Sequence, residues 1–171
     1  APMEKDAQRD IYMAELYFEK DSFNLALNGD PQYPGFLEIA EEYSSTKTGE
    51  LANYYAGLCY LHTADYENAI IYLEKFSSDD VILSSLAKGC IGDAYLEIGQ
   101  TDDAIDSYNK AIKNTSNNFT TTRYMMKLAQ LYEKNGNFND ALDLYKSIKV
   151  DFKESEEAKG IEKYISRAEK R

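Results

Sequence analysis

The sequence predicts an all-α protein: about four helical hairpins in succession and a C-terminal capping helix, wound into a right-handed superhelix. Three observations lead to this fold class. Apolar residues recur with the period of an α-helix through most of the 171 residues. A pattern of small and aromatic residues returns in three successive segments between residues 50 and 150. Proline, which breaks helices, occurs only three times, and two of these prolines are Pro31 and Pro34.

The recurring pattern is a small residue followed three positions later by tyrosine and twelve positions later by alanine. The small residues are Gly57, Gly92 and Ala129, and the alanines are Ala69, Ala104 and Ala141. The intervals of 35 and 37 residues are close to the roughly 34-residue period of a two-helix repeat. Small residues allow the two helices of a hairpin to approach closely, and the tyrosines are expected to fill the space between successive hairpins.

Residues 1–48 are interpreted as a degenerate first repeat. Ala14, Tyr17 and Ala26 occupy the places of the pattern, but a turn-rich insertion at residues 28–35 interrupts it. A helical stripe resumes at Phe36. The second helix of this repeat is therefore predicted to be divided in two.

Three regular repeats are predicted at residues 50–83, 85–118 and 122–154, followed by a capping helix within 155–171. Terminal caps of this kind keep the last hairpin of an array from exposing apolar surface. The whole chain, 1–171, is predicted to be a single domain. The expected helices are 4–19, 22–28, 35–44, 49–62, 66–76, 82–98, 101–113, 120–135, 138–150 and 155–169.

The turns within the hairpins carry glycine where a helix ends in a left-handed residue, at Gly99 and Gly136. Ala64 occupies this place in the first regular repeat, so a slightly strained turn is expected there. Two Asn-X-Ser/Thr sequons, beginning at Asn114 and Asn118, fall in a predicted loop between repeats and are interpreted as loop-forming polar residues.

The net charge and the absence of catalytic motifs exclude several classes of function. Nineteen basic against thirty acidic residues give a net charge of −11, which disfavours nucleic acid and anionic membranes as partners. His62 is the only histidine, and no nucleophile motif surrounds it. Cys59 and Cys90 lack metal-ligand spacing and are expected to be core residues, with their redox state open. The chain is therefore predicted not to be an enzyme and to hold no metal or cofactor.

With these residues, the chain resembles the tetratricopeptide-repeat (TPR) family over nearly its whole length. The strings at 26–30, 35–43 and 72–77 are similar to TPR proteins of Bacteroidetes type, which resemble an ancillary, chaperone-like subunit of the Sec translocon. This resemblance implies a transmembrane anchor preceding Ala1, outside this chain, and a tethered position on the periplasmic side of the inner membrane. A cytoplasmic location stays open.

The TPR resemblance also implies a concave groove, lined by the first helix of each hairpin, that binds a peptide or a partner protein. The groove positions carried over to this sequence are Tyr54, Leu58, Leu61, His62, Asp93, Leu96, Glu97, Arg123, Lys127, Gln130 and Lys134. Ile11, Glu15 and Phe18 would extend the groove in the first repeat. The positions are apolar and aromatic near the middle and basic in the last repeat, which suits a partner with an apolar anchor and an acidic stretch.

Other interpretations remain open at this stage. The groove positions could simply be solvated helix faces. Alternatively, the array could be a homo-oligomerising structural element without a separate peptide ligand, in which Tyr33 and Phe36 of the insertion are buried between copies. A small-ligand site between hairpins has no supporting motif.

Overall fold

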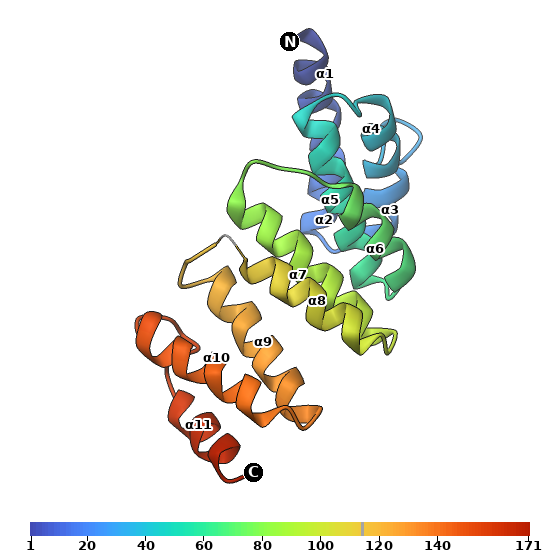
Figure 1. The fold of residues 1–171 in the computed structure, drawn as a ribbon. Helices are drawn as coiled ribbons and strands as arrows, with labels where there is room; N and C mark the ends of the chain where they lie inside the picture. Colours follow the sequence, from blue (N-terminus) through green and yellow to red (C-terminus); the bar gives the residue numbers. More distant parts are fainter. Residues whose placement is uncertain (114) are drawn as a thin grey trace. The chain divides into compact units, whose positions relative to one another are not determined.

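A computed structural model describes residues 1–113 and 115–171; Asn114, which begins the first sequon, lies outside the described residues. Within these residues the chain forms eleven α-helices, which confirms the predicted all-α repeat array (Figure 1). The helices belong to two compact units. The N-terminal unit comprises residues 1–79 and 93–100, and the C-terminal unit comprises residues 80–92 and 101–171.

The helix bounds follow the sequence closely. The N-terminal unit contains α1 (Pro2–Asp10), α2 (Tyr12–Glu19), α3 (Phe23–Asn28), α4 (Phe36–Glu42), α5 (Lys47–His62) and α6 (Tyr66–Lys75). Helix α7 (Val81–Glu97) contributes to both units, and the C-terminal unit continues with α8 (Thr101–Ile112), α9 (Thr120–Lys134), α10 (Phe138–Asp151) and α11 (Ile161–Glu169). The limits of the individual repeats stay a prediction.

Two predicted helices differ from the structure. The expected helix 4–19 is two helices that meet at Ile11, whose backbone stays in the right-handed helical region (φ −72°, ψ −17°). The capping helix begins at Ile161 and not near residue 155, because Gly160 adopts a left-handed conformation (φ 76°). The residues before Gly160 form turns, in which the Ser155 hydroxyl donates a hydrogen bond of 2.7 Å to the Phe152 carbonyl.

The insertion is folded back on itself and divides the second helix of the first hairpin, as predicted. Asp30 closes it, because one carboxylate oxygen accepts hydrogen bonds from the N–H groups of Gln32 (2.7 Å) and Tyr33 (2.9 Å). The other oxygen accepts a hydrogen bond from the Tyr17 hydroxyl on α2. An isolated antiparallel bridge joins Gly29 and Pro34 at the base of the loop.

Phe36, the first residue after this loop, is fully buried within the chain, so the expectation that it is exposed on a single chain and available for burial between copies was wrong. Its ring stacks on Tyr55 of α5 at a centroid distance of 4.8 Å and meets Phe18 of α2 edge-on at 6.3 Å. The closed insertion turns α4 back over α3 and α5, which places Phe36 in the core.

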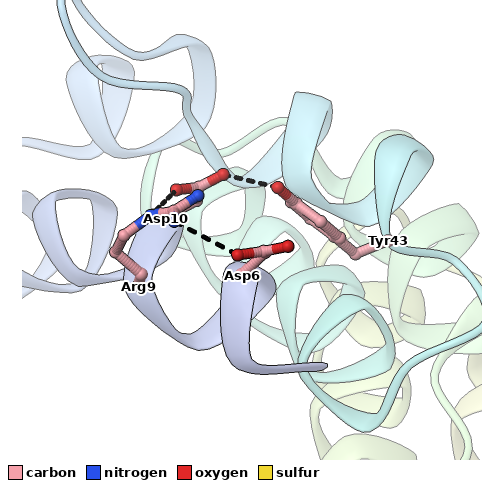
Figure 2. Close-up of polar contacts among 4 residues, drawn as sticks. All are labelled: Asp6, Arg9, Asp10 and Tyr43. Atoms are coloured by element: carbon pink, nitrogen blue, oxygen red, sulfur yellow. Dashed lines mark hydrogen bonds and ion pairs between the residues drawn. The ribbon is translucent and has the colours of Figure 1, made fainter. Parts of the chain in front are cut away.

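Polar contacts fix α1 to the end of α4 (Figure 2). The Tyr43 hydroxyl donates a hydrogen bond of 2.5 Å to Asp10, and Arg9 forms ion pairs with Asp10 (2.9 Å) and Asp6 (3.1 Å). The hydrogen bond to Asp10 is the main reason that the pKa of Tyr43 is raised to about 12. Because Tyr43 is buried, this contact orders the N-terminal helix against the rest of its unit.

The small residues of the repeat act as predicted. A Cβ atom added at Gly57 would lie 2.5 Å from the Leu73 side chain, and one added at Gly92 would lie 2.7 Å from the Tyr108 ring. Both distances are shorter than any relaxed contact, so the helices of each hairpin approach to a separation that only glycine allows at these positions.

The hairpin turns all contain a residue with positive φ. In the second and third regular repeats it is glycine, at Gly99 (φ 79°) and Gly136 (φ 83°). In the first regular repeat it is Ala64, at φ 61°, which confirms the expected strain. A left-handed conformation costs a non-glycine residue roughly 1–2 kcal/mol.

We expect Ala64→Gly to raise the free energy of unfolding by about 1 kcal/mol, and Gly99→Ala to lower it by about 1 kcal/mol. A Cβ at Gly99 would meet nothing within 4 Å, so the second change isolates the backbone term. Urea denaturation followed by circular dichroism measures both changes. Equal signs for the two substitutions would contradict the conformational explanation.

A polar cluster joins the capping helix to the last hairpin. Arg167 of α11 donates two hydrogen bonds to the Glu133 carboxylate of α9, at 2.6 and 2.9 Å, and the Tyr145 hydroxyl of α10 donates a third at 2.9 Å. The Glu133 side chain is only 14 % exposed. The hydrogen bonds from Arg167 are the main reason that the pKa of Glu133 is lowered from its ordinary value of 4.5.

Because the folded state lowers this pKa, the ionised Glu133 stabilises the fold above about pH 4.5, and this contribution is lost as the pH falls through the lower folded value. We expect Glu133→Gln to reduce the free energy of unfolding by about 1–2 kcal/mol near neutral pH. The lower value applies if water screens the ion pair strongly, because the Arg167 side chain is partly exposed. Denaturation curves of wild type and variant across this range should converge at acid pH. A difference that persists there would show that Glu133 acts through packing and not through charge; Lys134→Gln serves as the exposed control.

Candidate protein-binding surfaces

The four groove positions predicted on α9 lie on one side of that helix. Arg123, Lys127, Gln130 and Lys134 are separated by four, three and four positions, the spacing of neighbours on a helix face. Arg123, Gln130 and Lys134 are exposed. Lys127 is half-buried, with its amine 5.8 Å from the centroid of the Tyr124 ring. These residues form a surface of positive charge that a negatively charged segment can approach; we call it the α9 face.

The groove positions of α5 are less accessible. Tyr54 is buried, and its ring centroid is 5.1 Å from that of Phe76. Leu58 and Leu61 are half-buried. His62 is exposed, and its ring stacks face to face on Phe23 at a centroid distance of 4.5 Å, with an interplanar angle of 3°. The single histidine therefore extends the aromatic core of the N-terminal unit.

The part of α7 that belongs to the N-terminal unit carries three further groove positions. Asp93 is half-buried, whereas Leu96 and Glu97 are exposed. Leu96, at 39 % exposure, is the most accessible apolar side chain of the predicted set. Together with Leu58 and Leu61 it offers apolar contact area in this unit.

The positions suggested in the first repeat do not form a free surface. Ile11 is buried in the core with Ala7 and Ala14, so its assignment to the groove was wrong. Glu15 is half-buried, and burial raises its pKa even though a hydrogen bond with Tyr55 opposes the shift. Phe18 packs against Phe23 at 5.6 Å and is part of the same core.

A cleft that the sequence did not predict lies between α3, α4, the first half of α5 and the end of α6. It encloses about 680 Å³. Its apolar lining comes from Leu27, Leu37, Ala40 and Tyr72. Glu38, Glu41 and Glu50 add carboxylates, and of these Glu38 and Glu41 are exposed. We call this the acidic cleft.

The described residues contain no cluster of His, Cys, Asp and Glu that could hold a metal ion. Cys59 is a free thiol and is buried. Burial raises the pKa of Cys59 to about 12, which makes this thiol unreactive near neutral pH. None of the described helices is both long and apolar enough to cross a bilayer.

Comparison with protein families gives two matches, both to models described as tetratricopeptide repeat. One covers residues 91–156 and the other residues 51–79, which together are more than half of the chain. The chain is a tetratricopeptide-repeat protein. TPR arrays are protein-interaction modules, and proteins of the TPR family usually have no enzymatic activity.

Two curated relatives are TPR protein 29 of Macaca fascicularis and of Homo sapiens. The chain is 31 % identical to the first over 112 residues and 32 % identical to the second over 116 residues, which is 61 % and 63 % of its own length. It spans about a quarter (24 %) of either relative. The crystal structure of nearly identical TPR-like repeats from a putative kinesin light chain of Podospora anserina has the same fold, with a TM-score of 0.65 and 14 % identity over 94 % of this chain and 84 % of that one.

The TPR assignment explains which surfaces the sequence could reveal. The α9 face lies on the first helix of a hairpin, where family positions can be counted along a regular repeat. The acidic cleft arises where the first hairpin departs from the repeat, because α3 and α4 replace a single second helix. In the sequence, only the turn-rich residues 28–35 indicated this departure from the repeat. They did not indicate in which direction the chain continues as α4.

Proposed function

We propose that this TPR protein is a scaffold or chaperone-like adaptor that binds an acidic segment of a partner protein on the α9 face. The observation that carries the proposal is the row of Arg123, Lys127 and Lys134 on one side of α9, in a chain whose net charge is −11. A basic surface on an otherwise acidic protein favours a negatively charged partner segment.

The local charge supports this choice. The C-terminal unit has 14 basic and 13 acidic side chains, so the unit that carries the α9 face is itself nearly neutral. Each exposed ion pair contributes roughly 0.2–1 kcal/mol, so two or three pairs account for a modest affinity. Apolar contacts must supply the rest.

The acidic-segment proposal is tested by fluorescence anisotropy, with a labelled peptide of aspartates and glutamates around one leucine as the probe. Arg123→Gln with Lys134→Gln should weaken binding by about tenfold, since two exposed ion pairs are lost. The matched control is Lys153→Gln with Lys170→Gln, which removes the same charge from exposed positions of the same unit. Equal binding of the two double variants would refute a role for the α9 face.

We further propose that the protein works in the bacterial cell envelope, tethered on the periplasmic side of the inner membrane. The similarity of residues 26–30, 35–43 and 72–77 to Bacteroidetes-type TPR proteins supports this location. Fractionation of source cells, followed by protease treatment of spheroplasts, tests it. Protein that remains soluble after lysis, or that is protected from protease in intact spheroplasts, would contradict the proposal.

A homo-oligomeric structural role is the second candidate. It is favoured by large exposed side chains in the N-terminal unit, Tyr12 at 62 % and Tyr33 at 44 % exposure. The burial of Phe36 removes one of the two residues on which the idea first rested. Light scattering separates the candidates, because a monomer at high protein concentration rules this role out.

A further inference from the structure

We propose that the acidic cleft is a second binding surface, which takes a lysine- or arginine-rich segment of a partner protein that carries one apolar side chain. This surface is distinct from the α9 face and selects the opposite charge. The inference rests on how the cleft is built, on its lining and on the charge of its unit.

The cleft is a fixed feature of the N-terminal unit. The Asp30 turn and the bridge between Gly29 and Pro34 hold the end of α3 next to the start of α4. A Cβ atom at Gly35 would lie 2.2 Å from the Leu27 carbonyl oxygen, so the two backbones are in direct contact. Phe36 then anchors α4 to α5 through its stacking on Tyr55. With both ends of the insertion held, α4 cannot swing in to fill the space beside α6.

The lining combines apolar contact with negative charge. Of the lining residues, Leu27 and Ala40 are almost fully buried, whereas Glu38 and Glu41 are exposed. Glu50 is held in place by a hydrogen bond of 3.1 Å from the Ser77 N–H. A single apolar side chain can enter such a space while flanking cations reach the carboxylates.

One cation of the protein itself lies in this cleft. The Lys75 amine lies 4.5 Å above the centroid of the Tyr72 ring, and both residues line the cleft. The ring face therefore accepts a positive charge here, as aromatic faces do elsewhere. Because Lys75 already occupies this face of the ring, a lysine or arginine of a partner would pair with the exposed carboxylates of Glu38 and Glu41.

Charge across the unit points to the same occupant. The N-terminal unit has 17 acidic and five basic side chains, a net charge of −12, and so carries all of the excess negative charge of the chain. A negative field of this size attracts basic segments and repels acidic ones and nucleic acid. A second copy of the same unit would be repelled as well, and this charge complementarity favours a basic segment of a partner protein as the occupant.

The test uses the full chain and fluorescence anisotropy, with a labelled lysine-rich peptide that has one central leucine. Glu38→Gln with Glu41→Gln should weaken binding by about tenfold, and Ser44→Arg, which places a cation at the exposed edge, should weaken it at least as much. The matched control is Glu19→Gln with Glu67→Gln, two exposed carboxylates of the same unit outside the cleft, for which we expect a change of about twofold or less. All these positions are exposed, and circular dichroism confirms that each variant is folded.

Three outcomes would overturn the inference. Equal weakening by the two double glutamate variants would show attraction to the whole unit and not to the cleft. Absence of saturable binding to wild type would exclude the basic segment. Self-association of wild type that Ser44→Arg abolishes would identify a second copy as the occupant. The α9 variant Arg123→Gln with Lys134→Gln should leave this peptide unaffected, so failure of one surface is distinguishable from failure of the other.

Discussion

Gly89→Ala is expected to lower the free energy of unfolding by about 3 kcal/mol, the upper end of the usual cost of overpacking. A Cβ atom at Gly89 of α7 would lie 1.9 Å from the tip of the Tyr124 ring of α9, far inside van der Waals contact. The ring cannot move aside easily, because Tyr124 is 2 % exposed and stacks on Tyr108 at 6.0 Å. Urea denaturation followed by circular dichroism measures the loss.

A second substitution separates the clash from other effects. Leucine at position 124 does not reach the space that the end of the tyrosine ring occupies, so Tyr124→Leu should remove the conflict. In that background Gly89→Ala should stabilise by up to about 1 kcal/mol, because alanine favours a helix over glycine. Lys88→Ala, at the exposed neighbouring position, should change stability by less than about 0.5 kcal/mol. A similar cost of Gly89→Ala in both backgrounds would show that Tyr124 is not the cause.

Gly89 illustrates what the repeat pattern could and could not predict. The pattern identified Gly57 and Gly92 because small residues recur at those places. Position 89 falls three residues earlier, where the neighbouring repeats have Tyr54 and Met126. A glycine at a position where the other repeats have a large side chain indicates that another helix approaches closely there. Only the structure shows that the Tyr124 ring fills the space.

The regular features of the fold followed from the sequence because each depends on residues that are near one another in the chain. The positive φ at Ala64 and the glycine turns could be derived from positions within one hairpin. The Glu133 cluster could not, since Tyr145 and Arg167 are 12 and 34 residues away. On its own, a glutamate near a helix end is indistinguishable from a solvated one.

The candidate binding surfaces also differ in how far the sequence predicts them. Helical spacing was sufficient to place Arg123, Lys127 and Lys134 on one side of α9. It was not sufficient for Ile11, which has the right spacing at the junction of α1 and α2 but is covered by the core. The acidic cleft depends on the direction that α4 takes after the insertion, and this direction is set by hydrogen bonds of Asp30 that no periodicity reveals.

Phe36→Ala is expected to lower the free energy of unfolding by about 3–5 kcal/mol, the cost of replacing a buried phenylalanine with alanine. Phe36 is completely buried and contacts Tyr55 and Phe18, so the substitution leaves a cavity and removes two ring contacts. Tyr33→Ala is the matched control, because Tyr33 belongs to the same insertion but is 44 % exposed, and its loss should cost less than about 0.5 kcal/mol.

Denaturation curves combined with light scattering distinguish a core residue from an interface residue. If Phe36 served contacts between copies, its substitution would reduce association and leave the stability of the monomer unchanged. The buried position predicts the reverse, because α4 relies on this ring for its attachment to α5, and the acidic cleft should lose its shape together with the stability of the N-terminal unit.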